Sequence, residues 1–88
     1  MMGKFVMKVP GGKLLKVAVQ HDSEKIVKIK LCGDFFMHPE DALESLEGKL
    51  IGARLSQVRG IVADELADVR LYGVDVNSIV KAIWGAVG

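Results

Sequence analysis

Few residues of this 88-residue chain are of the types that carry catalysis or bind metals, and they do not cluster in the sequence. The two histidines, His21 and His38, each lie in or beside a predicted turn, without a second histidine or cysteine at metal-ligand spacing. A zinc site in a protein takes about three or four such ligands. We therefore predict no metal site in this chain, and we expect both histidines to be solvated turn residues.

Cys32 is the single cysteine, which excludes an internal disulfide. The tripeptide Cys32-Gly33-Asp34 lies at the end of a predicted strand, and iron–sulfur scaffold domains carry a similar tripeptide at a strand end. An iron–sulfur cluster, however, needs about three thiolates. A nucleophilic thiol also needs a helix N-terminus or a cationic neighbour to activate it, and the sequence shows neither. The favoured interpretation is a small apolar residue that fills space at a strand end, with a reactive thiol as the alternative.

The segment Pro10-Gly11-Gly12-Lys13 is rich in glycine and is followed by a lysine, but it is not a phosphate-binding P-loop. The first glycine of that motif and the Ser or Thr after its lysine are missing, and a strand follows instead of a helix. A tight turn is the favoured interpretation. A loop in which Gly11, Gly12 and Lys13 contact a ligand or a partner is the alternative. We predict no catalytic residue anywhere in the chain.

Two aromatic sites are candidates for binding a partner. In Gly33-Asp34-Phe35-Phe36, two adjacent rings cannot both point to one face of a strand, so the chain turns there or one ring is exposed. Asp34 suits an Asx-type turn. Trp84 lies in an apolar segment near the C-terminus, and tryptophan is enriched at interface hot spots. For the corner, the favoured interpretation is structural, with one ring packed under the helices, and presentation of a ring to a partner is the alternative. For Trp84, core packing and an interface are both open.

The first third of the chain has the pattern of a β-meander. Residues 4–9 form a short predicted strand, and residues 13–20 and 25–32 alternate between apolar and polar positions, which is typical of half-buried antiparallel strands. In the second of these strands Leu15, Val17 and Val19 share a face, and in the third Val27, Ile29 and Leu31 do so. A polar turn at residues 21–24 connects the two.

The rest of the chain has helical periodicity. A first helix is expected to start near Pro39-Glu40-Asp41 and end at about residue 50, and a second to span about residues 54–66. A third, capped by Asp75 or Asn77, carries the clearest apolar stripe. Strands followed by helices predict an α+β fold: one domain of residues 1–88, with a three-stranded antiparallel sheet covered on one face by about three helices.

Composition narrows the class of protein. Half of the residues are hydrophobic and the mean hydropathy is +0.30, which is high for a small domain and suggests that a partner covers part of its surface. No apolar run approaches the ~20 residues of a membrane span. A net charge of +1 argues against a nucleic-acid binder, although residues 1–30 carry +5 and residues 31–88 carry −4. We expect a cytoplasmic protein without nucleic-acid or membrane partners.

Four segments in order resemble a known family, and the match covers about residues 4–52. They are Lys8-Val9-Pro10-Gly11-Gly12-Lys13-Leu14-Leu15-Lys16-Val17, then Lys28-Ile29-Lys30-Leu31-Cys32-Gly33-Asp34-Phe35-Phe36, then Pro39-Glu40-Asp41, and Leu46-Glu47-Gly48-Lys49-Leu50-Ile51-Gly52. This order is similar to the C-terminal accessory domain of lipoate–protein ligases. The ligases' catalytic domain, with its Arg-Arg-x-x-Gly-Gly-Gly motif, has no counterpart here. The chain thus resembles the small accessory subunit of a two-chain ligase.

The resemblance implies a heterodimer with a separate catalytic subunit, at which ATP, Mg²⁺ and lipoate bind, while this chain alone binds no cofactor. The accessory subunit would be required for ATP-dependent activation of lipoate to lipoyl-AMP, before transfer to a lysine of lipoyl domains, which it would serve indirectly. The alternative is an accessory protein of iron–sulfur or sulfur-transfer assembly with similar topology, which binds a desulfurase. A third possibility is an unrelated interaction module.

Overall fold

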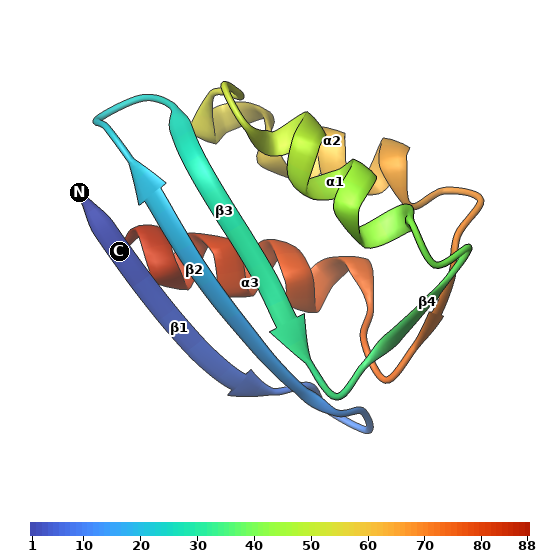
Figure 1. Ribbon diagram of the computed structural model, residues 1–88. Helices are drawn as coiled ribbons and strands as arrows, with labels where there is room; N and C mark the ends of the chain where they lie inside the picture. The colour runs from blue at the N-terminus through green and yellow to red at the C-terminus, as the bar shows by residue number, and fades with distance from the viewer.

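The computed structural model describes all residues, 1–88, and has the predicted α+β architecture (Figure 1). Three antiparallel strands in the order β1-β2-β3 form the main sheet, and β4 and β5 form a second sheet of two strands. The elements are β1 Met2–Lys8, β2 Leu14–His21, β3 Ile26–Gly33, β4 Phe36–His38, α1 Ala42–Leu50, the 3-10 turn η1 Leu55–Gln57, α2 Val58–Glu65, β5 Arg70–Tyr72 and α3 Val76–Val87. No helix is long and apolar enough to cross a membrane.

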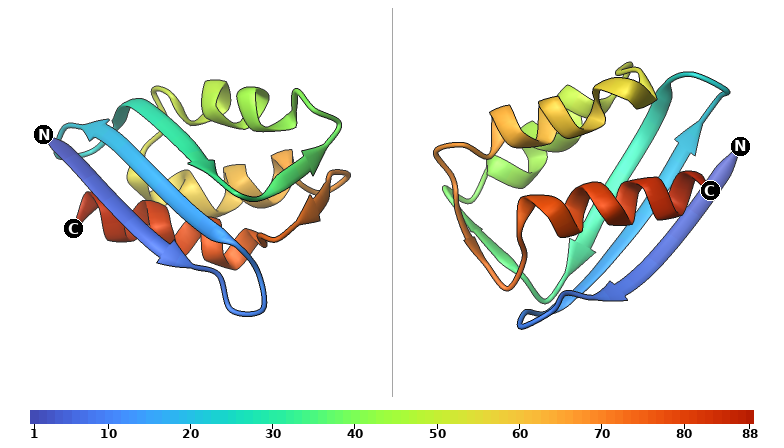
Figure 2. Two further views of the ribbon diagram at one scale, coloured as in Figure 1. Left: turned by 60° about the horizontal axis from the view of Figure 1, so that its bottom comes forward. Right: turned by 180° about the vertical axis from the view of Figure 1, so that it is seen from behind.

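Alternation along the main sheet separates a dry face from an open one. Leu15, Val17 and Val19 of β2 are buried, and their neighbours point to the other side. The helices cover the dry face: α3 packs against β1 and β2, and α1 packs against β3 (Figure 2). Figure 1 views the sheet from its open side, with α3 behind it. A three-stranded sheet is stable only when its apolar face is covered in this way.

The predicted facing of β3 is wrong at its start. Ile26 is buried and Val27 is exposed, whereas the strict alternation placed Val27 with Ile29 on the dry face. The cause is a shift in register: Gln20 pairs with Lys28 but His21 pairs with Ile26, so Val27 is an extra residue in the ladder. Such a β-bulge reverses the facing of the residues beyond it.

The turn before β3 is fixed by Asp22, whose carboxylate accepts hydrogen bonds from the backbone N–H groups of Glu24 and Lys25 at 2.8 and 2.7 Å. These bonds, that from Glu24 first, lower the pKa of the Asp22 carboxyl below its usual value. His21, predicted to be solvated, is instead buried at the end of β2. The reason is that β2 extends one residue further than expected, which turns this side chain onto the dry face.

The three predicted helices are present. The first begins at Ala42 rather than at Pro39, because residues 39–41 form a turn, and its Leu46 and Leu50 are fully buried. Asp75 caps α3 as predicted, accepting a hydrogen bond of 2.7 Å from the backbone N–H of Ser78. The apolar stripe of α3 supplies much of the core, but Trp84, which the sequence places beside it, is 43% exposed.

The small β4–β5 sheet was not predicted. Phe36 pairs with Tyr72, Met37 with Leu71 and His38 with Arg70. Each strand has only three residues, so neither shows enough alternation to be recognised in the sequence. The second sheet joins the end of β3 to the segment that precedes α3, and it thereby shapes the site described next.

Candidate partner-binding site

Two of the three segments singled out in the sequence lie at one end of the molecule. The β1–β2 turn at residues 10–13, the corner at residues 33–36 and the β5–α3 connection at residues 72–73 come together at the bottom of Figure 1. We call these three segments the aromatic end, because they hold three of the five aromatic residues: Phe35, Phe36 and Tyr72.

Glycines allow the β1–β2 turn to approach β5 closely. The backbone N–H of Lys13 donates to the carbonyl of Gly73 at 2.8 Å. A Cβ on Gly12 would lie 2.5 Å from that carbonyl oxygen, and Gly11 has a φ of 69°, which favours glycine. The favoured interpretation, a tight turn, is therefore confirmed as the local geometry, and the glycines are explained by backbone packing. A ligand contact by Gly11, Gly12 and Lys13 stays a prediction.

The corner after β3 is held against the start of β2. The backbone N–H of Asp34 donates to the carbonyl of Leu14 at 3.2 Å. Gly33 has a φ of 153°, and a Cβ at this position would lie 2.0 Å from the same carbonyl oxygen. Only glycine fits between the two strands at this point. The corner is thus a rigid turn whose direction decides where the following rings point.

The rings of Phe35 and Phe36 point to different environments, as the sequence required. Phe35 is half-buried and packs against the core, whereas Phe36 is 50% exposed. The Phe36 ring lies beside that of Tyr72, with centroids 5.8 Å apart and planes inclined by 39°. Tyr72 is 51% exposed and was missed in the sequence. The sequence feature that could have indicated Tyr72 is an aromatic residue directly before a glycine, in an apolar segment for which no strand or helix was predicted.

The surroundings of the ring pair are polar and cationic. His38 and Arg70 pair across the small sheet two residues along from Phe36 and Tyr72, and both are exposed. Residues two apart on a strand face the same side, so His38 and Arg70 lie beside Phe36 and Tyr72 on the outer face. An apolar centre with a polar edge is the general layout of a protein–protein contact.

Trp84, the other predicted partner-binding residue, does not lie at the aromatic end. It is on the C-terminal half of α3, which runs away from the β5–α3 connection toward the chain termini (Figure 2). Next to it, Gly85 packs on β1: a Cβ there would lie 2.6 Å from the Phe5 ring. The two predicted aromatic sites are therefore separate surfaces.

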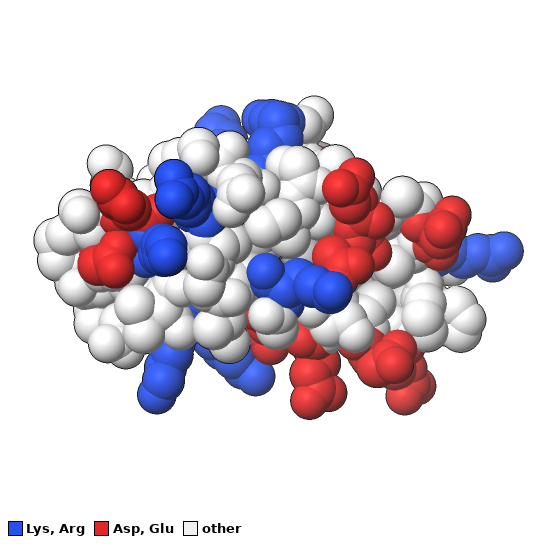
Figure 3. Space-filling view, turned by 90° about the horizontal axis from the view of Figure 1, so that it is seen from above, with Lys and Arg blue, Asp and Glu red and all other residues white.

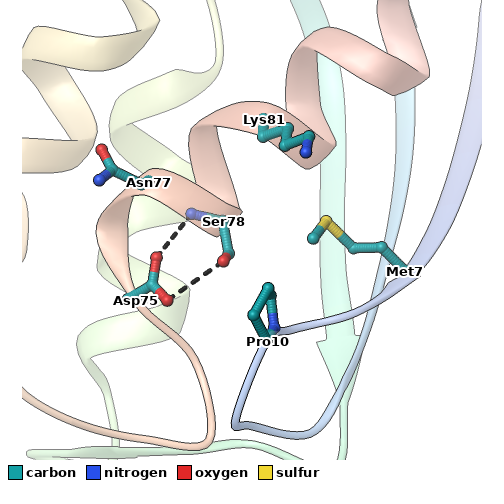
Figure 4. A pocket seen from close by; sticks show the side chains of 6 residues that line it. All are labelled: Met7, Pro10, Asp75, Asn77, Ser78 and Lys81. Carbon is teal, nitrogen blue, oxygen red and sulfur yellow. Dashed lines mark hydrogen bonds between the residues drawn. The ribbon is translucent and has the colours of Figure 1, made fainter.

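A groove of about 330 Å³ lies beside the aromatic end, at the start of α3 (Figure 4). It is lined by Met7, Pro10, Asp75, Asn77, Ser78 and Lys81. Both carboxylate oxygens of Asp75 are used within the helix cap, one by the backbone N–H of Ser78 and the other by its hydroxyl at 3.1 Å. The groove is thus built around a helix cap. Elsewhere in the molecule, no three His, Cys, Asp or Glu side chains are placed to share a metal ion.

Cys32 is exposed, so its interpretation as a buried space-filling residue is wrong. It lies opposite Lys16 on the open face of the sheet, because its place in β3 alternates with the buried Leu31. The structure thus places the thiol on a different surface from the aromatic end.

No family model matches the chain. Among curated proteins, lipoate-protein ligase A subunit 2 of Thermoplasma acidophilum is 37% identical over 71 residues, which are 80% of this chain and 76% of that protein. The chain belongs to the family of lipoate–protein ligase small subunits. A chain in the solved structure of a bipartite lipoate protein ligase and its E2 lipoyl domain, from the same archaeon, matches with a TM-score of 0.87 and 31% identity over 94% of each chain.

Membership in this family confirms the resemblance found in the sequence and the role as an accessory ligase subunit. The alternative, an accessory protein that binds a desulfurase, is not favoured.

Proposed function

We propose that this chain is required by a separate catalytic subunit for ATP-dependent activation of lipoate to lipoyl-AMP, before the lipoyl group is transferred to a lysine of a lipoyl domain. In this proposal ATP, Mg²⁺ and lipoate bind at the catalytic subunit, and this chain supplies no catalytic residue. The observation that carries the proposal is the match, over nearly the whole chain, to a chain of a ligase described as bipartite.

Adenylation gives a physical reason for a second subunit. ATP and a carboxylate repel one another, so the reaction needs them held in line with their charges neutralised and water excluded. Transfer to a protein acceptor needs an open approach instead. A subunit that binds the closed arrangement more tightly than the open one shifts the equilibrium toward activation, through its differential contacts alone.

The aromatic end is the surface by which we propose that the chain holds its catalytic partner. Phe36 and Tyr72 are each about half exposed, and aromatic side chains are enriched at the centres of stable interfaces. Their strands are tied to the main sheet through Gly33 and Gly73, so little order has to be gained on binding.

An assay of lipoate-dependent ATP–pyrophosphate exchange tests the requirement. The purified chain, the catalytic subunit of the same organism, and their mixture are compared. We expect exchange only in the mixture, or at least a tenfold gain over the catalytic subunit by itself. Exchange by this chain alone would show that it holds the catalytic site, and equal exchange with and without it would show that it is not required.

A further inference from the structure

The open face of the main sheet carries a concentration of positive charge. We define this face by the outward residues of β1, β2 and β3, and its five lysines are Lys4, Lys8, Lys16, Lys28 and Lys30, all exposed. None of the three strands contains an acidic residue. No ion pair within the sheet therefore compensates this charge.

The acidic residues lie elsewhere. Seven of the eleven are in or beside α1 and α2: Glu40, Asp41, Glu44, Glu47, Asp64, Glu65 and Asp68. In Figure 3, where the open face lies along the lower edge, basic side chains project from that edge at the left and acidic ones project from it at the right, with further acidic side chains at the far left end. Lysines two positions apart on one strand, such as Lys28 and Lys30, are about 7 Å apart, which is within the screening length of about 8 Å at physiological salt, so their charges act together.

The same face has a shallow hollow of about 240 Å³. Ala18 and Lys30 line it, and Ala18 lies between Lys4 on β1 and Lys30 on β3 because these three residues are in one cross-strand row. Met2 and Lys28 also line it. The hollow is open and too shallow to enclose a small ligand, which usually takes a concave pocket of about 300–1,000 Å³. A protruding side chain or loop from another protein fits it better.

We propose that this open face is the docking surface for the lipoyl acceptor domain, which would present an acidic surface to it. This inference rests on the proposed function, because only a ligase subunit has such an acceptor. The acceptor must arrive, react and leave in every turnover. Long-range attraction between charges speeds arrival without tight retention, whereas lysine is depleted from the centres of stable interfaces.

We therefore assign the two surfaces to two different partners. The aromatic end has the composition of a stable contact and is assigned to the catalytic subunit, and the open face has that of a transient contact and is assigned to the acceptor. The two surfaces share β3, whose last residue, Gly33, leads into the corner. An acceptor on the open face would thus be held close to the catalytic subunit.

Charge removal on the open face tests the proposal. The variant Lys28→Ala/Lys30→Ala is compared with Lys49→Ala/Arg59→Ala, which removes the same charge from exposed positions on α1 and α2. Each is assembled with the catalytic subunit and assayed twice, for ATP–pyrophosphate exchange and for transfer to the unlipoylated acceptor domain at about 20 mM and about 300 mM salt.

We expect normal exchange from both variants. At low salt the open-face variant should raise the KM for the acceptor by about fivefold to tenfold, and the difference should shrink at high salt, while the control stays within about twofold. An unchanged KM with normal exchange overturns this inference alone. A raised KM for ATP in the exchange assay would assign the lysines to the nucleotide and also overturn it. Failure of the wild-type chain to stimulate exchange would instead defeat the proposed function.

Cys32 provides a second readout that does not depend on activity. It is the chain's single cysteine and lies exposed on the open face, so its rate of alkylation reports whether that face is covered. We expect the acceptor domain, added to the complex, to slow alkylation of Cys32 in a salt-sensitive manner, as followed by mass spectrometry of this chain. Equal protection by the catalytic subunit alone would make the open face the subunit interface and would overturn the proposal.

Discussion

The open face and the aromatic end meet at the end of β3 but are built in opposite ways. The open face consists of outward residues on three neighbouring strands, each of which could change without disturbing the backbone below it. The aromatic end joins segments near residues 10–13, 33–36 and 72–73, which touch backbone to backbone at Gly12, Gly33 and Gly73. Side chains define the first surface, and backbone packing defines the second.

This difference indicates how each surface should respond to substitution. A lysine on the open face contributes charge and little packing, so its loss should change association and leave stability almost intact. Gly12 and Gly33 at the aromatic end leave no room for a Cβ against the neighbouring backbone, so replacing either should move the strands that carry the rings. The following predictions test that contrast, from the largest expected effect to the smallest.

Gly33→Ala should produce the largest loss. The new Cβ would lie 2.0 Å from the Leu14 carbonyl oxygen, which is backbone and can move only with β2. Overpacking and an unfavourable φ together should lower the free energy of unfolding by about 2–4 kcal/mol, as measured by urea denaturation. A loss below about 1 kcal/mol would show that the corner can rearrange, and the aromatic end would then be less rigid than proposed.

Phe36→Ala/Tyr72→Ala should weaken binding of the catalytic subunit by about 2 kcal/mol or more, measured by calorimetry. The rings are half exposed, so the cost in folding stability should be about 1–2 kcal/mol. Phe35→Ala should lower folding stability more than it weakens binding of the catalytic subunit, because Phe35 packs against the core. Trp84→Ala is the matched control: if it weakens binding and the double variant does not, the catalytic subunit docks on α3.

Gly60→Ala should stabilise the protein. This glycine is exposed in the first turn of α2, and a Cβ there would meet no atom within 4 Å. Removing it should gain about 0.5–1 kcal/mol in the free energy of unfolding, because glycine is a poor helix former. It is also the control for Gly33→Ala, which adds the same Cβ at a position where φ is 153° and a carbonyl oxygen would lie 2.0 Å away. A loss of stability would mean that helix propensity does not limit α2.

Cys32→Ser should have the smallest effect, within about 0.5 kcal/mol in thermal unfolding, because the side chain is exposed on the open face. Exchange activity should also remain within about twofold of wild type. A folded variant without activity would show that the thiol takes part in chemistry, and the open face would then be more than a surface of charge.

The sequence predicted most of the fold but only part of the site. Period-two alternation identified the three long strands, and the stripe after Asp75 identified α3 with its cap. It also required that one ring of the pair Phe35 and Phe36 be exposed. It could not say which one, since that depends on the direction in which the chain leaves Gly33.

What the sequence determined by itself is local. Alternation and helical periodicity follow from the geometry of one segment, so a long segment identifies its own type and, where no bulge interrupts it, its buried side. The charge of the open face also followed from the sequence, because the strands that carry it are adjacent along the chain.

Only the tertiary structure decided the contacts between distant segments. The pairing of Phe36 with Tyr72, the close approach of Gly12 to Gly73, and the hydrogen bond from the Leu31 N–H to the Glu47 carboxylate at 2.7 Å join residues that are 16 or more positions apart. A strand of three residues has no period, and a side chain that reaches another element gives no sign of its partner. The aromatic end exists because α1 packs on β3 and α2 packs on α1 and α3, which returns the chain to the corner after β3.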